Sequence, residues 1–273
     1  MKFKTITSFI FALCVFSLQA QLPIDGSIDS TFGNNGLSVF NHPSKNISPI
    51  TSKFGTDGKF YTVSRIGSGN DRDVLLNRFT SNGTLDNSFG NNGSVTWNPS
   101  IGGPDFAKSL KLTANNKIIV VGHLYSNNRQ YLIGRFLSDG TLDTTFNQTG
   151  MDIGGGAYND EYKDCVVEPN GDVTVVGLNS NVIGSEKLIR RYKSNGSLDL
   201  AFGFNGTSVL DESDDESFSQ IYRKNSNTYY LVGLTNGTNK LYAYDGNGNS
   251  IGTFGSSGKF TFDQLTGYEV VIT

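Results

Sequence analysis

The hydrophobic pattern is clearest between Ala107 and Ile153, where short apolar segments alternate with polar turns. Lys117–Gly122 (KIIVVG) is a continuous apolar run rich in β-branched residues, which is typical of a strand buried on both faces. A polar loop follows it, and Ser138-Asp139-Gly140 is a turn signal in which glycine supplies the positive φ of a tight hairpin. No stretch has helical periodicity over a useful length. The pattern predicts one unit of four short antiparallel strands: Ala107–Thr113, Lys117–Gly122, Gln130–Leu137, and a broken fourth strand over Leu142–Phe146 and Met151–Ile153.

The same order of segments returns elsewhere along the chain. The buried second strand is expected again at Lys59–Val63, Asp172–Gly177 and Thr228–Gly233, and the third strand at Val74–Phe79, Leu188–Tyr192 and Leu241–Tyr244. Four complete units result, with partial units expected at Ile24–Phe40 and Tyr268–Thr273. The complete units are Ile47–Asn98, Asp105–Gly154, Asp160–Asp211 and Ser217–Phe262.

A short motif marks every unit and sets the period of the chain. Its copies are Asp25–Gly36, Asn82–Gly93 (NGTLDNSFGNNG), Asp139–Gly150, Asn195–Gly206 and a degraded Asn247–Gly258. The aromatic anchors Phe32, Phe89, Phe146, Phe202 and Phe254 lie 57, 57, 56 and 52 residues apart. Four-stranded units repeated in series at such a period are the signature of propeller blades. We therefore predict an all-β fold, a β-propeller-like array of four-stranded antiparallel blades with about four complete repeats; a solenoid of stacked sheets is the main alternative.

The motif also contains a recurring pair of opposite charges. An arginine stands five residues before the turn glycine and an aspartate three residues after it, so the two can meet across the hairpin. These pairs are Arg78 with Asp86, Arg135 with Asp143, and Arg191 with Asp199. Both partners are missing together in the fifth copy, which has Ala243 and Ile251 at these positions. The spacing predicts structural ion pairs that hold the blade hairpins; a ring of ligand-binding carboxylates is the alternative.

The first twenty residues have the pattern of a signal peptide. Lys2 and Lys4 precede an apolar run, and a small residue, Ala20, stands at the expected cleavage point. We expect residues 21–273 to form a single repeat domain, exported to the extracellular space or the outer cell surface. The mature chain has one cysteine, Cys165, so it has no intramolecular disulfide; a buried structural thiol is expected there.

Composition and charge exclude several classes of function. The formal net charge of −3 leaves no electrostatic footprint for nucleic acid, and the mature chain has no apolar run long enough to span a membrane. Charged residues make up 17% of the chain, against a usual value of about 25%, so sheet packing is expected to supply most of the stability. The chain has only two histidines, too few for most metal sites built from several histidines. His42 and His123 are expected to be surface or packing residues.

Two sets of polar residues remain as candidates for chemistry. Asp105, Asp160 and Asp164 lie near the starts of predicted first strands, where propeller glycosidases place the paired carboxylates of their central channel. Solvated loops between blades would give the same placement, and no nucleophile elbow, phosphate loop or metalloprotease motif is present. No catalytic residue and no cofactor is therefore predicted.

Calcium is the ion that the sequence fits best. Asp245, Asn247 and Asn249 place oxygen ligands at alternate positions, as hard cations prefer, although the acidic residue expected downstream is replaced by Ser256. A plain Asn/Gly hairpin turn explains the same residues. The acidic run Asp211–Glu216 is expected to be a solvated loop, with weak calcium binding as a secondary interpretation.

The extended motif from Arg78 to Gly93 resembles the delta-60 repeat of large secreted and surface bacterial proteins. The resemblance covers nearly all of residues 22–273, and three copies match closely. It implies a propeller-forming, non-catalytic surface module and carries no catalytic residues to this chain. We expect a secreted structural or ligand-binding module for a glycan or a protein; the alternative is a secreted carbohydrate-active hydrolase that uses channel carboxylates.

Overall fold

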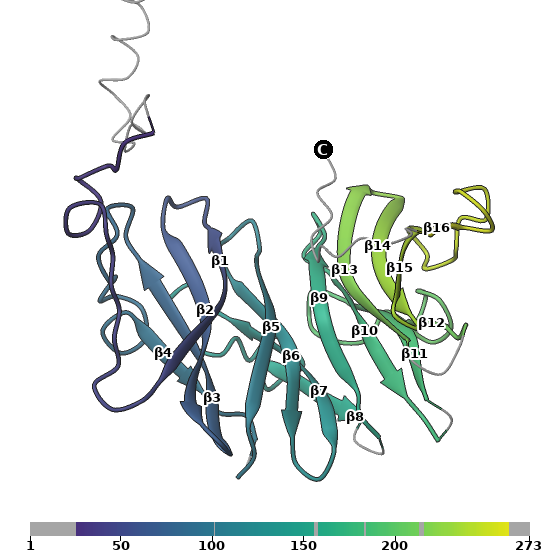
Figure 1. Ribbon diagram of the computed structural model, residues 1–273, viewed down its shortest axis with the longest axis horizontal. Coiled ribbons are helices and arrows are strands. Elements are labelled where there is room, and N and C mark those ends of the chain that lie inside the picture. The colour runs from purple at the N-terminus through teal and green to yellow at the C-terminus, as the bar shows by residue number, and fades with distance from the viewer. Residues whose placement is uncertain (1–25, 101, 156–157, 183, 213–215, 262–273) are drawn as a thin grey trace, which may run out of the picture.

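The computed structural model describes residues 26–100, 102–155, 158–182, 184–212 and 216–261, and these contain strands and turns but no helix. Sixteen strands form four antiparallel sheets of four strands each, numbered here as blades 1 to 4 (Figure 1). Blade 1 consists of β1 (Ile47–Phe54), β2 (Phe60–Ser68), β3 (Asp71–Phe79) and β4 (Ser94–Trp97). Blade 2 consists of β5 (Asp105–Leu112), β6 (Ile118–Tyr125), β7 (Arg129–Phe136) and β8 (Met151–Gly155). Blade 3 consists of β9 (Glu161–Val167), β10 (Val173–Ser180), β11 (Ser185–Tyr192) and β12 (Thr207–Leu210). Blade 4 consists of β13 (Glu216–Asn225), β14 (Thr228–Thr235), β15 (Thr238–Asp245) and β16 (Lys259–Thr261).

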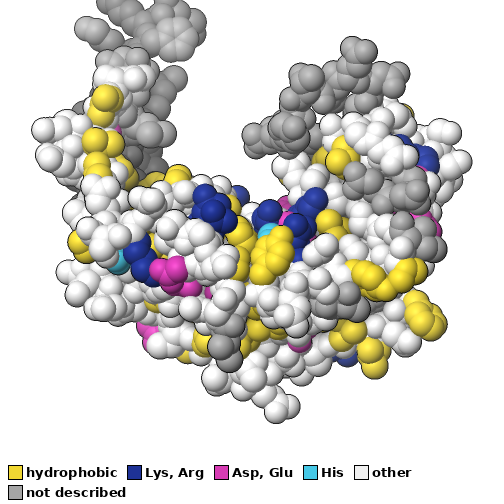
Figure 2. All heavy atoms as spheres, turned by 60° about the horizontal axis from the view of Figure 1, so that its bottom comes forward, with side chains coloured by type: hydrophobic (Ala, Val, Ile, Leu, Met, Phe, Trp, Pro, Cys, Tyr) yellow, Lys and Arg dark blue, Asp and Glu magenta, His cyan; other side chains and the backbone are white. Residues whose placement is uncertain are grey.

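Within each blade the strands follow one another in sequence order, so every connection is a hairpin. The blades stand side by side in an arc, with blade 1 at one end and blade 4 at the other (Figure 1). The first strands of neighbouring blades lie next to each other: β1 contacts β5, β5 contacts β9, and β9 contacts β13. These first strands therefore line the inner side of the arc, which the space-filling view shows as a hollow between its two ends (Figure 2).

The hydrophobic cores lie between blades, which explains the continuous apolar runs of the second strands. Ile118 and Val120 of β6 pack with Val63 of blade 1, whereas Ile119 and Val121 pack with Val175 of blade 3. All six side chains are almost completely buried. Alternate residues of one strand thus belong to two different cores, and both sets must be apolar. The predictions of an all-β fold and of four complete four-stranded repeats are confirmed.

Two details differ from the sequence-based expectation. Leu142–Phe146 is not part of a strand, because the Asp143 side chain accepts the Thr145 N–H and folds the chain into a turn. Residues 26–46 contain only an isolated bridge between Asn34 and Leu37, and so add no strand to the four sheets. The predicted signal peptide and the predicted strand Tyr268–Thr273 lie outside the described residues. The part of the chain that the structure describes has no helix that could cross a membrane.

Candidate functional site

The repeated motif forms a clasp between successive blades. Four of the five anchor phenylalanines pack on the turn glycine of the next blade, where a Cβ would come within 2.7 to 3.0 Å of the phenylalanine ring. A backbone hydrogen bond accompanies the contact, for example Gly90 N–H to Asp139 O at 2.7 Å. Phe32 makes the same contact with Gly83, so residues before β1 dock on blade 1 as one blade docks on the next. The pairs are Phe32 with Gly83, Phe89 with Gly140, Phe146 with Gly196, and Phe202 with Gly248.

The arginines of the motif reinforce this clasp. Arg78 pairs with Asp86 at 2.9 Å, and Arg135 pairs with Asp143 at 2.7 Å. Each guanidinium also lies over the ring of its own anchor phenylalanine and donates a hydrogen bond to a turn carbonyl of the next blade, Ser138 O for Arg78. These arginines therefore connect blades as well as the two arms of one hairpin.

The third predicted pair has a different arrangement. Arg191 donates a hydrogen bond to the Tyr229 hydroxyl at 2.6 Å, and Asp199 lies 3.8 Å from Lys193. The reason is local: blade 4 places a tyrosine, Tyr229, within reach of the guanidinium, whereas blade 2 has Ile118 at the equivalent position in β6.

The motif aspartates are held in their charged form by their neighbours. Burial alone would raise the pKa of Asp143, but hydrogen bonds from Lys117 and Thr145, with the charge of Arg135, bring that pKa to about 2. The pKa of Asp86 is lowered in the same way, against the effect of burial, by Lys59 and Ser88. Carboxylates that are this fully paired inside the fold are poorly placed to take up an external ligand.

The inner side of the arc has a distinctive local structure. The first strand of every blade contains a β-bulge at the same register position, occupied by Ile50, Lys108, Lys163 and Ser219. A bulge turns one extra side chain out of the ladder, and bulges are frequent next to binding sites. Here the two bulged lysines reach the following blade, Lys108 to Glu161 at 2.9 Å and Lys163 to Ser217 at 2.9 Å.

The channel carboxylates predicted from the sequence are not brought together as a catalytic pair. Asp164 accepts hydrogen bonds from the Ser109 hydroxyl and the Ile221 N–H, and pairs with Lys111 at 2.9 Å. Asp160 is nearly buried and accepts the Ser180 N–H at 2.9 Å. Asp105 is completely buried at the start of β5.

A cluster of aromatic and charged side chains lies where the inner surface meets the hairpins of blades 1 and 2. We call it the concave cluster; its members are Arg72, Phe106, Lys108, His123, Tyr125, Arg129 and Glu161. The His123 ring stacks on Phe106 with centroids 4.8 Å apart, and Tyr125 meets both rings edge-on at 5.9 and 5.5 Å. Arg72 lies over the Phe106 ring at 5.8 Å. Figure 2 shows basic, hydrophobic and histidine side chains gathered in the hollow of the arc.

Glu161 is the acidic centre of this cluster. It is buried, and it pairs with Arg129 at 2.7 Å and with Lys108 at 2.9 Å. Burial alone would raise its pKa, but His123, 3.5 Å away, and Lys108 hold the pKa of Glu161 at about 2. Burial lowers the pKa of His123, so this imidazole is neutral at pH 7. The concave cluster therefore has three cations and one anion, a surplus of positive charge on a chain whose formal net charge is −3.

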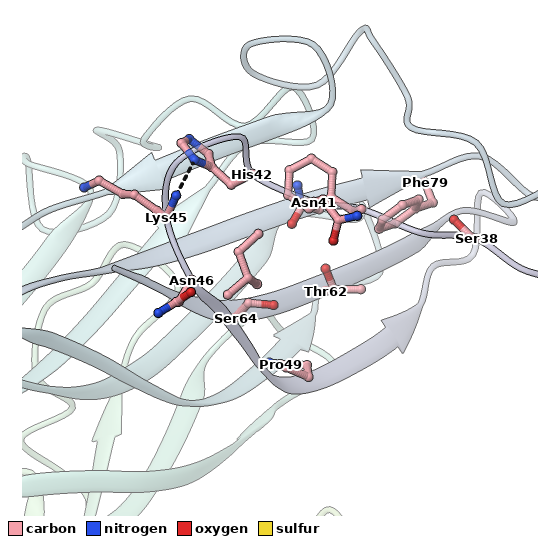
Figure 3. A pocket seen from close by; sticks show the side chains of 12 residues that line it. Ser38, Asn41, His42, Lys45, Asn46, Pro49, Thr62, Ser64 and Phe79 are labelled. Atoms are coloured by element: carbon pink, nitrogen blue, oxygen red, sulfur yellow. Dashed lines mark hydrogen bonds between the residues drawn. The ribbon is translucent and has the colours of Figure 1, made fainter. Parts of the chain in front are cut away.

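A second hollow, of about 520 Å³, lies at the free side of blade 1. In Figure 3 the side chains of Asn41, Thr62, Ser64 and Phe79 surround the same space, between the segment before β1 and the sheet. Thr62 has the position that Val120 occupies in blade 2, where the preceding blade packs. The pocket is thus the counterpart of an inter-blade core, and it is polar where none of the described blades covers it.

The charged residues of this pocket are already paired. Lys45 lies 3.1 Å from Asp71 and 3.7 Å from Asp73. The His42 Nδ1 accepts the backbone N–H group of Lys45 (Figure 3) and also that of Ser44. We therefore regard the concave cluster, and not this pocket, as the better candidate for ligand binding.

The proposed calcium ligands form a hairpin turn. The Asp245 carboxylate accepts the N–H groups of Asn247 and Asn249 at 2.8 and 2.9 Å, and the Asn249 side-chain amide at 3.1 Å. Although burial would raise it, these hydrogen bonds lower the pKa of Asp245. Closure of the turn therefore accounts for the spacing of Asp245, Asn247 and Asn249. Over the described ranges, no three His, Cys, Asp or Glu side chains converge as a metal site.

The acidic run 211–216 is solvated at Asp211, which is exposed, but not at its other described positions. Glu216 is buried and Glu212 nearly so, and both lie 3.0 Å from Lys187 Nζ, which is itself completely buried. Cys165 is a buried free thiol in β9, and burial raises its pKa strongly. Sequence reasoning missed both the Lys187 centre and the concave cluster, because their members come from different blades and no local pattern connects them.

Comparison with known proteins gives one finding on the family. Residues 113–146 match a family model described as a domain of unknown function (DUF5122) beta-propeller. That segment contains β6, β7 and the following motif up to its anchor Phe146. No curated protein matches the chain. Together with four consecutive four-stranded antiparallel blades, this match identifies the fold as a β-propeller.

Proposed function

We propose that this protein is an exported, non-catalytic binding module of the delta-60 repeat type, and that it binds a glycan on its concave face. The observation that carries the proposal is the concave cluster. It combines stacked aromatic rings with partly exposed cations on the open side of a rigid repeat scaffold, an arrangement suited to recognition. An open concave surface also admits a long polymer, because neither end of the ligand has to enter a closed cavity.

The state of the carboxylates favours binding over hydrolysis. A glycosidase needs two carboxyl groups that both reach the sugar, one of them as a proton donor. Asp105 and Asp160 are buried, and Asp164 and Glu161 are held by cations and backbone N–H groups. Hydrolysis therefore remains the weaker alternative.

The proposal is tested with the exported protein and a panel of soluble polysaccharides. Affinity electrophoresis or calorimetry measures binding, and reducing-end release measures hydrolysis. We expect binding to at least one polysaccharide without turnover, and weaker binding by the Tyr125→Ala variant, which removes an edge of the aromatic cluster. Turnover that is lost in Asp105→Asn or Asp164→Asn would favour the hydrolase instead, and failure to bind any polysaccharide would contradict the proposal.

A further inference from the structure

Arg72 and Arg129 occupy equivalent positions in blades 1 and 2, and they differ in what faces them. Val74 of β3 and Tyr131 of β7 are equivalent residues of their blades. Arg72 and Arg129 each lie two residues before them, near the start of the third strand. Arg129 reaches the next blade and pairs with the Glu161 carboxylate at 2.7 Å. Arg72 also reaches the next blade, but there it meets the Phe106 ring. Phe106 and Glu161 are equivalent residues of β5 and β9. Between blades 1 and 2 the arginine therefore meets an aromatic ring, whereas between blades 2 and 3 it meets a carboxylate.

The guanidinium of Arg72 has no acidic partner within the described residues. No ion pair or hydrogen bond joins its side chain to that part of the chain, and its Cζ lies over the Phe106 ring, 5.8 Å from the ring centroid. The adjacent Asp71 and Asp73 are directed to Lys45, at 3.1 and 3.7 Å. A guanidinium held over a ring by a cation–π contact makes no hydrogen bond to it, so its N–H donors remain free to bind the two oxygens of a carboxylate.

The surroundings of Arg72 restrict its mobility and add positive charge. The Phe106 ring stacks on His123 and makes a T-shaped contact with Tyr125, so its aromatic neighbours hold the ring under the guanidinium in place. Lys108, a bulged and partly exposed residue of the same strand as Phe106, contributes a second cation. The sole acid of the cluster, Glu161, is buried and already shared by Lys108 and Arg129, so it does not neutralise Arg72.

We infer that the glycan bound by the concave face is acidic, a polymer of uronic acid residues, and that Arg72 binds its carboxylate groups on the Phe106 platform. The inference rests on the proposed glycan-binding function and specifies its ligand class. The pair of Arg129 with Glu161 is the internal analogue: it shows that an arginine at this position of a blade can bind a carboxylate. At Arg72 the position of Glu161 is filled by the Phe106 ring, so the carboxylate would come from the ligand.

The test uses two polymers with the same sugar backbone, one with free carboxylate groups and one with uncharged methyl esters in their place. These are polygalacturonate and the same polymer fully methyl-esterified, titrated into the full protein by calorimetry at low salt. We expect polygalacturonate to bind at least about tenfold more tightly than the ester, since losing one charge-assisted bidentate contact is a change of this order. Arg72→Gln should remove most of that difference, and Arg72→Lys should restore only part of it because lysine has no planar fork.

Lys224→Gln is the matched control, because it removes one positive charge from an exposed side chain on blade 4 that stacks on Tyr230. It should leave the affinity for polygalacturonate within about twofold of the wild type. An equal loss in Lys224→Gln and Arg72→Gln would mean that net charge alone is responsible, and would overturn the inference.

The remaining outcomes separate the inference from the proposed function. Equal binding of the ester and the acid overturns the role of the carboxylates but leaves a glycan-binding module. Equal binding of polygalacturonate, dextran sulfate and DNA identifies unspecific attraction of polyanions and overturns the uronate assignment. If neither pectic polymer binds while a neutral glycan does, the uronate inference is wrong but the proposed glycan binding stands. If no glycan binds, both the inference and the proposed function are wrong.

Discussion

Asp105 offers a direct test of how the blades are packed. It is the first residue of β5 and is completely buried, and neither carboxylate oxygen has a hydrogen-bond partner in the described ranges. Burial, assisted by the nearby charge of Asp73, raises its pKa to about 6, although the proximity of Ser100 offsets part of the effect. The equivalent residue in blade 4, Glu216, has a buried lysine beside it, whereas Asp105 has none.

The raised pKa means that the charged form of Asp105 opposes folding. Relative to a usual aspartate, a pKa of about 6 corresponds to a cost of about 3 kcal/mol at neutral pH. The folded state binds the proton more tightly than the unfolded state, so this cost is complete above pH 6. It falls to about 1 kcal/mol near pH 4.5 and vanishes at lower pH. Asp105→Asn removes the charge at every pH and should stabilise the protein by the corresponding amount.

The assay is urea unfolding of wild type and Asp105→Asn at pH 7.5 and pH 4.5. We expect a gain of up to about 3 kcal/mol at pH 7.5 that shrinks to about a third at pH 4.5. Asp160→Asn is the control, because Asp160 has the same register position in blade 3 but already accepts the Ser180 N–H. Equal effects of Asp105→Asn at both pH values, or a loss of stability at pH 7.5, would refute the description of Asp105 as an uncompensated buried charge.

Three further predictions concern the contacts between blades, each read from urea unfolding or the melting temperature. Lys187→Met should lower stability by about 3–5 kcal/mol because it leaves the buried Glu216 without its cation; a loss below about 1 kcal/mol would contradict this. Asp143→Ala should cost about 3 kcal/mol and leave glycan affinity unchanged; an unchanged melting temperature would argue against a structural ion pair. Gly140→Ala combines φ of 93° with a clash against the anchor phenylalanine of the preceding blade, whereas Gly69→Ala has open space at φ of 58°. Gly140→Ala should therefore lower the free energy of unfolding by about 2 kcal/mol or more beyond the effect of Gly69→Ala. Equal effects of the two variants would argue against a tight contact between Gly140 and Phe89.

Contacts within one repeat could be predicted from the sequence because their partners are close along the chain. The apolar run Lys117–Gly122 indicated a strand buried on both faces, and β6 is buried by blades 1 and 3. The pairing of Arg78 with Asp86 followed from the hairpin register, since eight residues and one turn glycine separate them. Leu142–Phe146 was misread as a strand because the turn is stabilised by the Asp143 side chain, a contact that hydrophobic alternation does not reveal.

The sequence by itself determined the period, the four-stranded unit and the hairpin ion pairs of blades 1 and 2, because strand pairing in a hairpin depends only on neighbours in the chain. It did not determine the partners of Arg191 and Asp199, which the next blade and Lys193 supply. Only the tertiary structure decided which residue of the next blade each equivalent arginine contacts. Arg129 meets Glu161 and Arg72 meets Phe106, although both arginines have the same position in their blades. These partners lie more than thirty residues apart and on different sheets. Their contact depends on how two blades pack, and the secondary-structure propensities of single residues do not predict that packing.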